Sequence, residues 1–169
     1  TLPLIVQENE KLLSLNNKIK SIKNSFDQIS RKEADWIKKL MIQYTADTLD
    51  ALLIKVDEIP VSLALAQAVI ESGWGTSRFA FEGNALFGQY VWGATNQGII
   101  PNERKTDAKY KIKSFNSLSD SVSSYMKNLN TNFHYNEFRI NRFVLRSNNI
   151  PLKGTLLTKF LSSYSIEDN

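Results

Sequence analysis

The chain has 169 residues, 42% of them hydrophobic, and a net charge of +4. This length and composition fit one folded domain with a sizeable core and exclude an intrinsically disordered chain. The positive charge is too small and too scattered to predict binding to nucleic acid, although it suits weak attraction to an anionic polymer.

Cysteine is absent, which excludes a thiol nucleophile, disulfide bonds and thiolate-held metals. The only histidine is His134, so the two-histidine zinc motifs are excluded as well. We therefore expect neither a metal nor another cofactor, and carboxylates are the obvious groups for proton transfer. No apolar stretch approaches the length that spans a membrane, and no signal peptide opens the sequence.

Two amphipathic helices are predicted in the N-terminal third. Apolar residues spaced three or four apart between Leu12 and Ile29 form one stripe of a long helix. Ser30 and Glu33 form a capping box, so a second helix should begin near residue 31 and run towards Leu53. The stripe is too short for a convincing heptad repeat, which favours an antiparallel hairpin packed on the domain over a dimeric coiled coil.

A third helix is expected after Pro60, a residue that suits the first turn of a helix. Its residues are apolar nearly all round, as in a helix at the centre of a domain, and its only acidic side chain is Glu71 at the end. Apolar neighbours, the indole of Trp74 and the helix dipole should raise the pKa of this carboxyl group. Such an acid can protonate a departing oxygen, which suggests a glycan-cleaving enzyme. The alternative is a capping glutamate, or one paired with Arg78.

The central part of the chain changes character. Glycines and aromatic residues between 83 and 116 predict a lobe of two or three short strands, with Tyr110–Phe115 alternating at period two. Helical spacing returns at Ser117–Asn130 and Tyr135–Arg146, and a last helix is expected around Leu156–Tyr164. The sequence therefore predicts a mainly α fold with a small β-hairpin lobe.

The chain carries two closely spaced motifs, Glu-Ser-Gly-Trp-Gly at residues 71–75 and Asn-Ala-Leu-Phe-Gly at residues 84–88. They resemble the glucosaminidase domain of glycoside hydrolase family 73, especially its Bax-type bacterial members. The resemblance extends over most of the chain. It implies a lysozyme-like fold and hydrolysis of glycosidic bonds next to N-acetylglucosamine, usually in peptidoglycan. We expect one compact unit, with an N-terminal helical hairpin (1–56) packed on a glucosaminidase domain (57–169).

The resemblance makes Glu71 the general acid and implies a second carboxylate in the hairpin lobe. Glu103 falls at the family's interval and would hold a water molecule or steady positive charge on the sugar, with Asp107 as the fallback. Alternatively, Glu103 is a solvated loop residue. A substrate-assisted route, in which the acetamide group of the sugar itself attacks, would need no second carboxylate as nucleophile. The residues expected to contact or shape the sugar site are Trp74, Asn84, Phe87, Gln89, Tyr90, Trp92 and Tyr135, the last of which could equally be a core tyrosine.

The leading hypothesis is an endo-β-N-acetylglucosaminidase that hydrolyses β-1,4 bonds of peptidoglycan or a related glycan, in a groove between the helices and the hairpin lobe. The alternatives are a lytic transglycosylase on the same scaffold, a glycan-binding module without turnover, and a structural helix bundle. We expect a glycan polymer as partner and a monomeric chain. A periplasmic or secreted location is inferred from the substrate alone.

Overall fold

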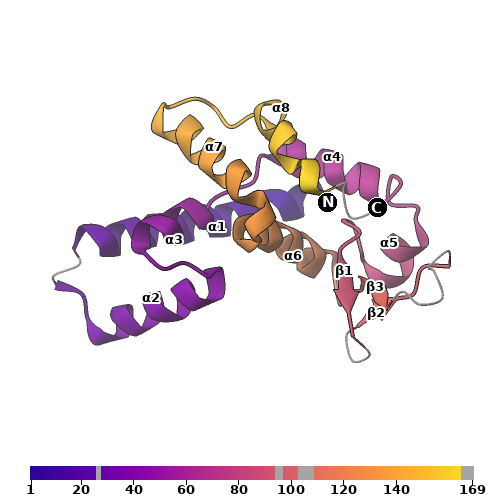
Figure 1. Cartoon of the computed structure of the whole chain (residues 1–169), viewed down its shortest axis with the longest axis horizontal. Helices are drawn as coiled ribbons and strands as arrows, with labels where there is room; N and C mark the ends of the chain where they lie inside the picture. The colour runs from indigo at the N-terminus through magenta and orange to yellow at the C-terminus, as the bar shows by residue number, and fades with distance from the viewer. Residues whose placement is uncertain (26–27, 94–96, 103–108, 165–169) are drawn as a thin grey trace.

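The computed structural model describes residues 1–25, 28–93, 97–102 and 109–164, and it confirms a mainly α fold with a small β lobe (Figure 1). Glu103 and Asp107 lie outside the described residues. The helices are α1 (Leu2–Asn24), α2 (Arg31–Tyr44), α3 (Leu49–Lys55), α4 (Val61–Glu71), α5 (Arg78–Gly83), α6 (Leu118–Thr131), α7 (Asn136–Ser147) and α8 (Gly154–Leu157), with 3-10 helices η2 (Phe133–Tyr135) and η3 (Thr158–Tyr164). The strands are β1 (Tyr90–Trp92), β2 (Gly98–Ile99) and β3 (Tyr110–Lys113).

The helix boundaries near the N-terminus confirm one prediction and correct another. The capping box is present, since Ser30 Oγ accepts a hydrogen bond from the Glu33 amide at 3.3 Å and the Glu33 carboxylate accepts one from the Ser30 amide at 2.8 Å. The expected continuation of this helix towards Leu53 is wrong. Helix α2 ends at Tyr44 because Thr45 adopts a left-handed conformation (φ 50°), and a new cap then starts α3.

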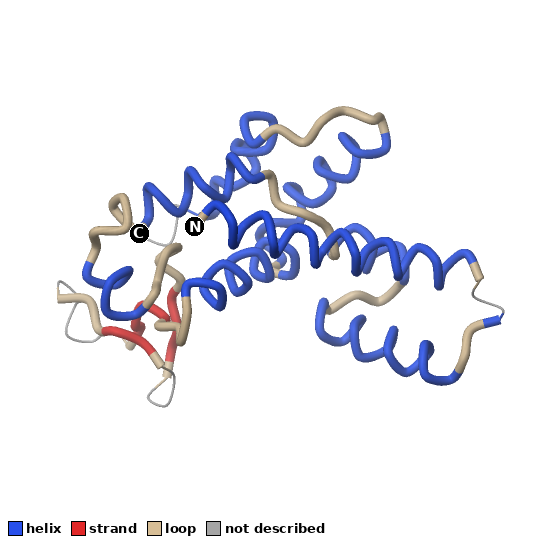
Figure 2. The backbone as a smooth tube through the Cα atoms, turned by 180° about the vertical axis from the view of Figure 1, so that it is seen from behind, coloured by secondary structure: helices blue, strands red, loops and turns tan. Residues whose placement is uncertain are grey.

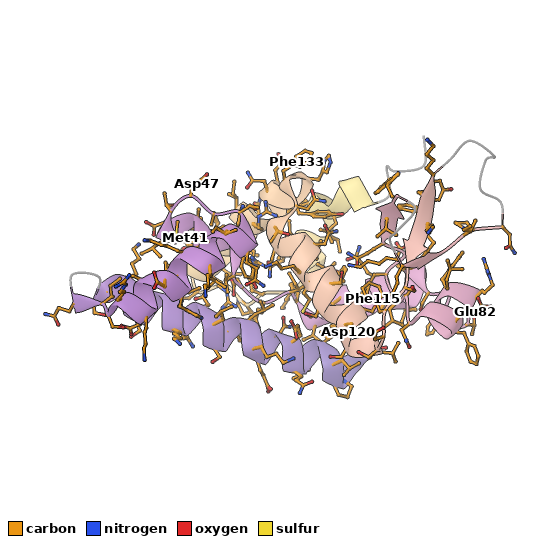
Figure 3. All side chains as sticks on the ribbon, turned by 90° about the horizontal axis from the view of Figure 1, so that it is seen from below. Met41, Asp47, Glu82, Phe115, Asp120 and Phe133 are labelled. Atoms are coloured by element: carbon orange, nitrogen blue, oxygen red, sulfur yellow. The ribbon has the colours of Figure 1, made fainter. Side chains whose placement is uncertain are left out.

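Helices α1 and α2 run in opposite directions, and α3 packs against both of them (Figure 2). Helix α1 also contacts α4 and α6, and α6 crosses over it (Figure 3). The apolar stripe of α1 faces these neighbours, because Leu12, Ile19 and Ile22 are all buried. Further large apolar side chains that are fully buried come from most of the chain: Ile5, Leu52, Ile59, Phe87, Tyr125, Met126, Leu129, Phe138 and Leu157. The core is therefore shared between the first 56 residues and the rest.

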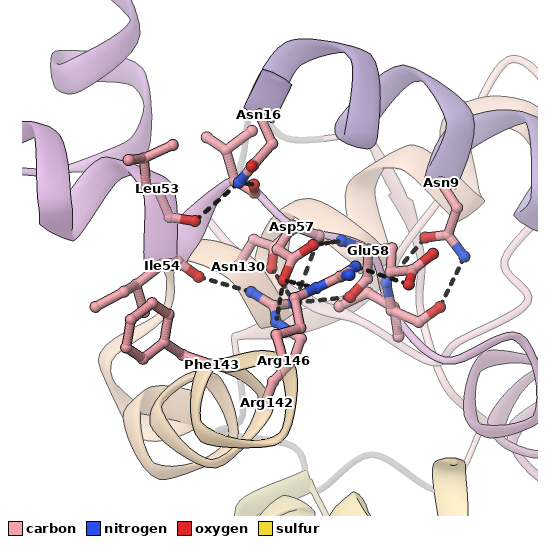
Figure 4. Close-up of polar contacts among 12 residues, drawn as sticks. Asn9, Asn16, Leu53, Ile54, Asp57, Glu58, Asn130, Arg142, Phe143 and Arg146 are labelled. Atoms are coloured by element: carbon pink, nitrogen blue, oxygen red, sulfur yellow. Dashed lines mark hydrogen bonds and ion pairs between the residues drawn. The ribbon is translucent and has the colours of Figure 1, made fainter. Parts of the chain in front are cut away.

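A buried polar network holds α7 against the segment that precedes α4 (Figure 4). The fully buried Arg142 donates to Asn130 Oδ1 at 2.8 Å and to the Ile54 carbonyl at 2.8 Å, and its Nε lies 3.6 Å from the Asp57 carboxylate. Arg146 Nε donates to the same carboxylate at 2.6 Å. Burial lowers the pKa of Arg142, and the Asp57 charge opposes this effect. The network therefore gives the guanidinium nitrogens Nη1 and Nη2 hydrogen-bond acceptors, while Nε has the Asp57 charge nearby but no hydrogen bond.

Helix α4 is less enclosed than the sequence predicts. Leu63, Ala64 and Ala68 are buried, but Ile70 is 73% exposed, so only one face of the helix meets the core. Within the described ranges, no helix combines the length and hydrophobicity needed to cross a membrane.

The β lobe follows α5 and lies at one end of the elongated molecule, opposite the end formed by α2 (Figure 1). Its antiparallel strands are ordered β1-β3-β2, with Tyr90 and Ile99 both paired to Ile112. Two further hydrogen bonds attach the lobe to the chain around α5, from Phe115 N to the Gly83 carbonyl at 2.8 Å and from Lys113 N to the Gln89 carbonyl at 2.7 Å. The lobe is thus held next to the C-terminal end of α4.

Candidate active site

Glu71 is the last residue of α4, and the chain leaves the helix through a tight turn. Gly73, Trp74 and Gly75 have φ angles of 56°, 61° and 77°, a left-handed run that flanking glycines make possible. This turn directs the Trp74 indole outwards, where it is 83% exposed. The expectation that apolar packing and the indole enclose the acid is therefore wrong, because Glu71 is itself an exposed residue.

The carboxylate of Glu71 lies against the backbone of Gly88, in the second motif. A Cβ atom added to Gly88 would stand 3.3 Å from Glu71 Oε2, closer than most such contacts. Gly88 also has a left-handed φ of 56°, which disfavours any other residue. A glycine at this position both permits the turn and leaves space for the acid, so the structure brings the two motifs together.

A buried aromatic pair lies beneath this position. Phe87 and Tyr125 stack with ring centroids 3.9 Å apart and planes 7° from parallel, and the Tyr125 hydroxyl donates to Gln67 Oε1. Gln67 lies one turn before Glu71 on α4, so both side chains share a face of that helix. Tyr125 thus connects α6 with the face of α4 that carries Gln67 and Glu71.

The electrostatics of Tyr125 show which groups surround it. Burial raises its pKa most, and the neighbouring Tyr135 and Glu71 raise it further. Glu71 of α4 and Tyr135 of η2 therefore both lie close enough to Tyr125 of α6 to influence its ionisation. Tyr125 is fully buried and Tyr135 is 5% exposed. The raised pKa keeps Tyr125 neutral, and the phenol remains a hydrogen-bonding group across the physiological range.

The first strand supplies further candidates. Tyr90 packs edge-on against Tyr110 with ring centroids 4.9 Å apart, and Trp92 lies 6.1 Å from Tyr90 and is 58% exposed. Gln89 Oε1 is buried and accepts no hydrogen bond from the described residues. An exposed indole and an unused amide oxygen are groups that a sugar and its acetamide would engage.

Asn84 and Arg78, both considered above as neighbours of the acid or the sugar, make contacts that stabilise the fold. Asn84 caps α5 with a φ of 51°, and its Nδ2 donates to the Phe115 carbonyl at 3.0 Å, which ties the helix to the β lobe. Arg78 lies 3.6 Å from Glu82 and donates to the Ile100 carbonyl at 2.7 Å. The Arg78 guanidinium also lies 5.0 Å from the centroid of the Phe79 ring.

The structure adds Tyr125 and Gln67 to the residues predicted around the acid. Tyr125 fitted the apolar stripe of its helix, so nothing in the sequence distinguished its hydroxyl from a core position. Gln67 had a usable signal, since it precedes Glu71 by four residues on a helix. Within the described part of the chain, no three acidic or histidine side chains cluster closely enough to hold a metal ion.

The part of the chain that matches known proteins includes all the site residues described above. Residues 47–150 match the family model described as Glucosaminidase, mannosyl-glycoprotein endo-beta-N-acetylglucosaminidase. The chain is 35% identical over 138 residues to Protein bax of Escherichia coli (strain K12), a similarity that covers 78% of this chain and 47% of that protein. The chain thus spans about half the length of this curated relative. No solved structure matches it.

Proposed function

Because the chain belongs to the glucosaminidase family, we propose that it hydrolyses glycosidic bonds next to N-acetylglucosamine in a polymeric glycan, with Glu71 as the general acid. The observation that carries this proposal is the position of the Glu71 carboxylate. It lies at the exposed end of α4, against Gly88 and near Tyr125. An acid at an accessible position can reach the oxygen of a bound sugar chain.

Glu71 would donate its proton to the leaving oxygen as the bond breaks. The C-terminal end of α4 carries partial negative charge, which favours the protonated form of an acid placed there. Tyr125 and Tyr135 would act by position, because Tyr125 is anchored by Gln67 and stacked on Phe87. A rigid surface beside the acid keeps proton and leaving oxygen aligned, which is a large part of enzymatic rate enhancement.

The β lobe would hold the sugar. The exposed face of Trp92 suits packing against the C–H groups of a pyranose ring, and Gln89 Oε1 would accept from the N–H of an acetamide group. Large apolar side chains are also exposed along the segment from α4 to β2: Ile70, Trp74, Phe81, Trp92 and Ile100.

The test of the acid is Glu71→Gln, which keeps the shape of the side chain and removes the transferable proton. We expect cleavage of purified sacculi to fall at least about a hundredfold, with an unchanged melting temperature. Glu82→Gln is the control, because Glu82 is an exposed glutamate paired with Arg78 on the next helix. Substantial cleavage by Glu71→Gln would refute the assignment.

Product analysis separates hydrolysis from the alternatives. Mass spectrometry would find a new reducing N-acetylglucosamine end for a glucosaminidase, whereas a lytic transglycosylase leaves an anhydro-sugar without added water. Glycan binding with no product at all would instead favour a binding module. We propose peptidoglycan as substrate, and therefore a place in the cell envelope or outside the cell. Glu103→Gln and Asp107→Asn would show whether a second carboxylate takes part, as a loss of rate without loss of binding.

A further inference from the structure

A polar cavity lies between α1, α2 and α6. Its volume is about 270 Å³, and the residues that line it are Glu8, Leu12, Gln43, Tyr44, Ser123, Ser124, Met126 and Lys127. None of the residues placed around Glu71 belongs to this lining. The volume falls just below the range of pockets that bind drug-sized molecules, so the cavity suits a ligand about the size of an amino acid.

One wall of the cavity carries a desolvated cation. Lys127 Nζ lies 3.3 Å from the ring centroid of Tyr44, is buried, and donates no hydrogen bond to any described residue. Burial lowers the pKa of Lys127 to about 8. A buried ammonium group without an acceptor is unfavourable, so an anionic ligand group would bind strongly there.

The same cavity carries a negative charge. Glu8 accepts hydrogen bonds from Ser123 Oγ at 2.9 Å and from Lys11 Nζ at 3.1 Å. Its charge adds to the effect of burial in raising the pKa of Tyr44 to about 12, so the carboxylate lies near this tyrosine. No ion pair within 4.0 Å joins Glu8 to Lys127, although both are described residues. The lining therefore holds two opposite charges that are not paired with each other, and Glu8 has its ion pair with the more exposed Lys11.

We propose that this cavity binds a small α-amino acid in its zwitterionic form, with the carboxylate on Lys127 and the ammonium group facing Glu8. A simple carboxylic acid would meet the repulsion of Glu8, and a simple amine would meet that of Lys127. A zwitterion satisfies both charges at once, and such pairing gives specificity as well as affinity. The Gln43 amide and the Ser124 hydroxyl, which accepts a hydrogen bond from Lys113 Nζ at 3.0 Å, supply further hydrogen-bonding groups around the ligand.

Calorimetric titration of the full chain with glycine tests the proposal, with acetate and methylammonium as probes that each carry one of the two charges. We expect one molecule of glycine to bind at least about tenfold more tightly than either probe. Near pH 8 a fraction of Lys127 is neutral, so binding of a carboxylate should take up protons, visible as a heat that depends on the buffer. Failure of glycine to bind, or equally tight binding of acetate, would overturn the proposal.

Two variants locate the site. Lys127→Met removes the charge but keeps the stem, and Glu8→Gln removes the opposite charge, so each should weaken glycine binding about tenfold or more. Lys18→Met is the matched control, because Lys18 of α1 lies 4.4 Å from the ring of Trp36 on α2, a similar lysine–aromatic contact, but Lys18 is exposed and does not line the cavity. If Lys127→Met fails to fold, Glu8→Gln decides the matter alone. Unchanged binding by a folded Lys127→Met or Glu8→Gln protein would refute the assignment. Because binding is measured without any glycan, the result does not depend on the proposed hydrolysis.

Discussion

Gly88 has two roles that a single substitution can separate. Its left-handed φ of 56° makes any side chain costly, and its Cβ position lies 3.3 Å from Glu71 Oε2. Gly75 shares only the first role, since its φ is 77° and no atom lies within 4 Å of the added Cβ. The pair therefore distinguishes backbone strain from displacement of the acid.

We predict that Gly88→Ala and Gly75→Ala each lower the free energy of unfolding by about 1–2 kcal/mol, the cost of a left-handed alanine. Only Gly88→Ala should also lower kcat, by up to about a hundredfold, because small displacements of a catalytic group have large effects. Chemical denaturation and steady-state kinetics on a soluble glycan fragment would measure the two effects. Equal activity of both variants would show that the contact with Glu71 does not matter.

The two sequence motifs drew attention to Glu71 and to the turn around Gly88, because their glycines and aromatic residues are local signals. That the two motifs lie side by side is a result of the fold. The exposure of Trp74 was not predictable, since it follows from three consecutive left-handed residues whose direction depends on the fold. The hydrogen bond between Tyr125 and Gln67 joins two helices that are far apart in the sequence, and no local sequence pattern predicts such a contact.

At the scale of elements, α7 is held by charge as well as by apolar packing. Arg142 is fully buried, and Asp57 is the carboxylate nearest to it in the described network. Removal of one partner from a buried ion pair leaves an uncompensated charge, which usually costs more than the pair contributes. Asp57 is thus the acidic side chain of this segment that contacts both Arg142 and Arg146.

We predict that Asp57→Asn lowers the free energy of unfolding by about 3–5 kcal/mol, measured by urea denaturation. Glu58→Gln should cost about 1 kcal/mol or less, since this carboxylate pairs at 2.7 Å with the more exposed Arg146. A small effect of Asp57→Asn would mean that the carbonyl and amide partners of Arg142 suffice to hold its charge.

The start of α2 was predicted better than its end. The Ser30 capping box is a strong local signal, and α2 begins where it indicates. The end of α2 depends on Thr45 in a left-handed conformation, which lacks the usual glycine signal, so the break before α3 was missed. Helix α4 was expected at the centre because its composition is apolar, but composition does not reveal that Ile70 faces solvent.

At the scale of the whole molecule, α1 is tied to the remainder by specific polar contacts. Asn9 Nδ2 donates to the Ile59 carbonyl at 2.7 Å, and Asn9 Oδ1 accepts from the Ile59 amide at 2.8 Å. Asn16 is also buried and donates to the Leu53 carbonyl at 3.0 Å. These paired bonds satisfy backbone groups that lie in the interior, so their loss would leave polar atoms buried without partners.

We predict from these contacts that a chain truncated to residues 57–169 does not fold by itself. It would lose the face that α1 presents to α4 and α6, including the fully buried Ile5 and Ile19, and would expose apolar surface around Ile59. The intact chain should unfold in a single cooperative step, with equal calorimetric and van't Hoff enthalpies. The truncated chain should instead show no cooperative melting and should bind a hydrophobic dye. A truncated chain that melted cooperatively and cleaved glycan would show that the first 56 residues are a separate domain.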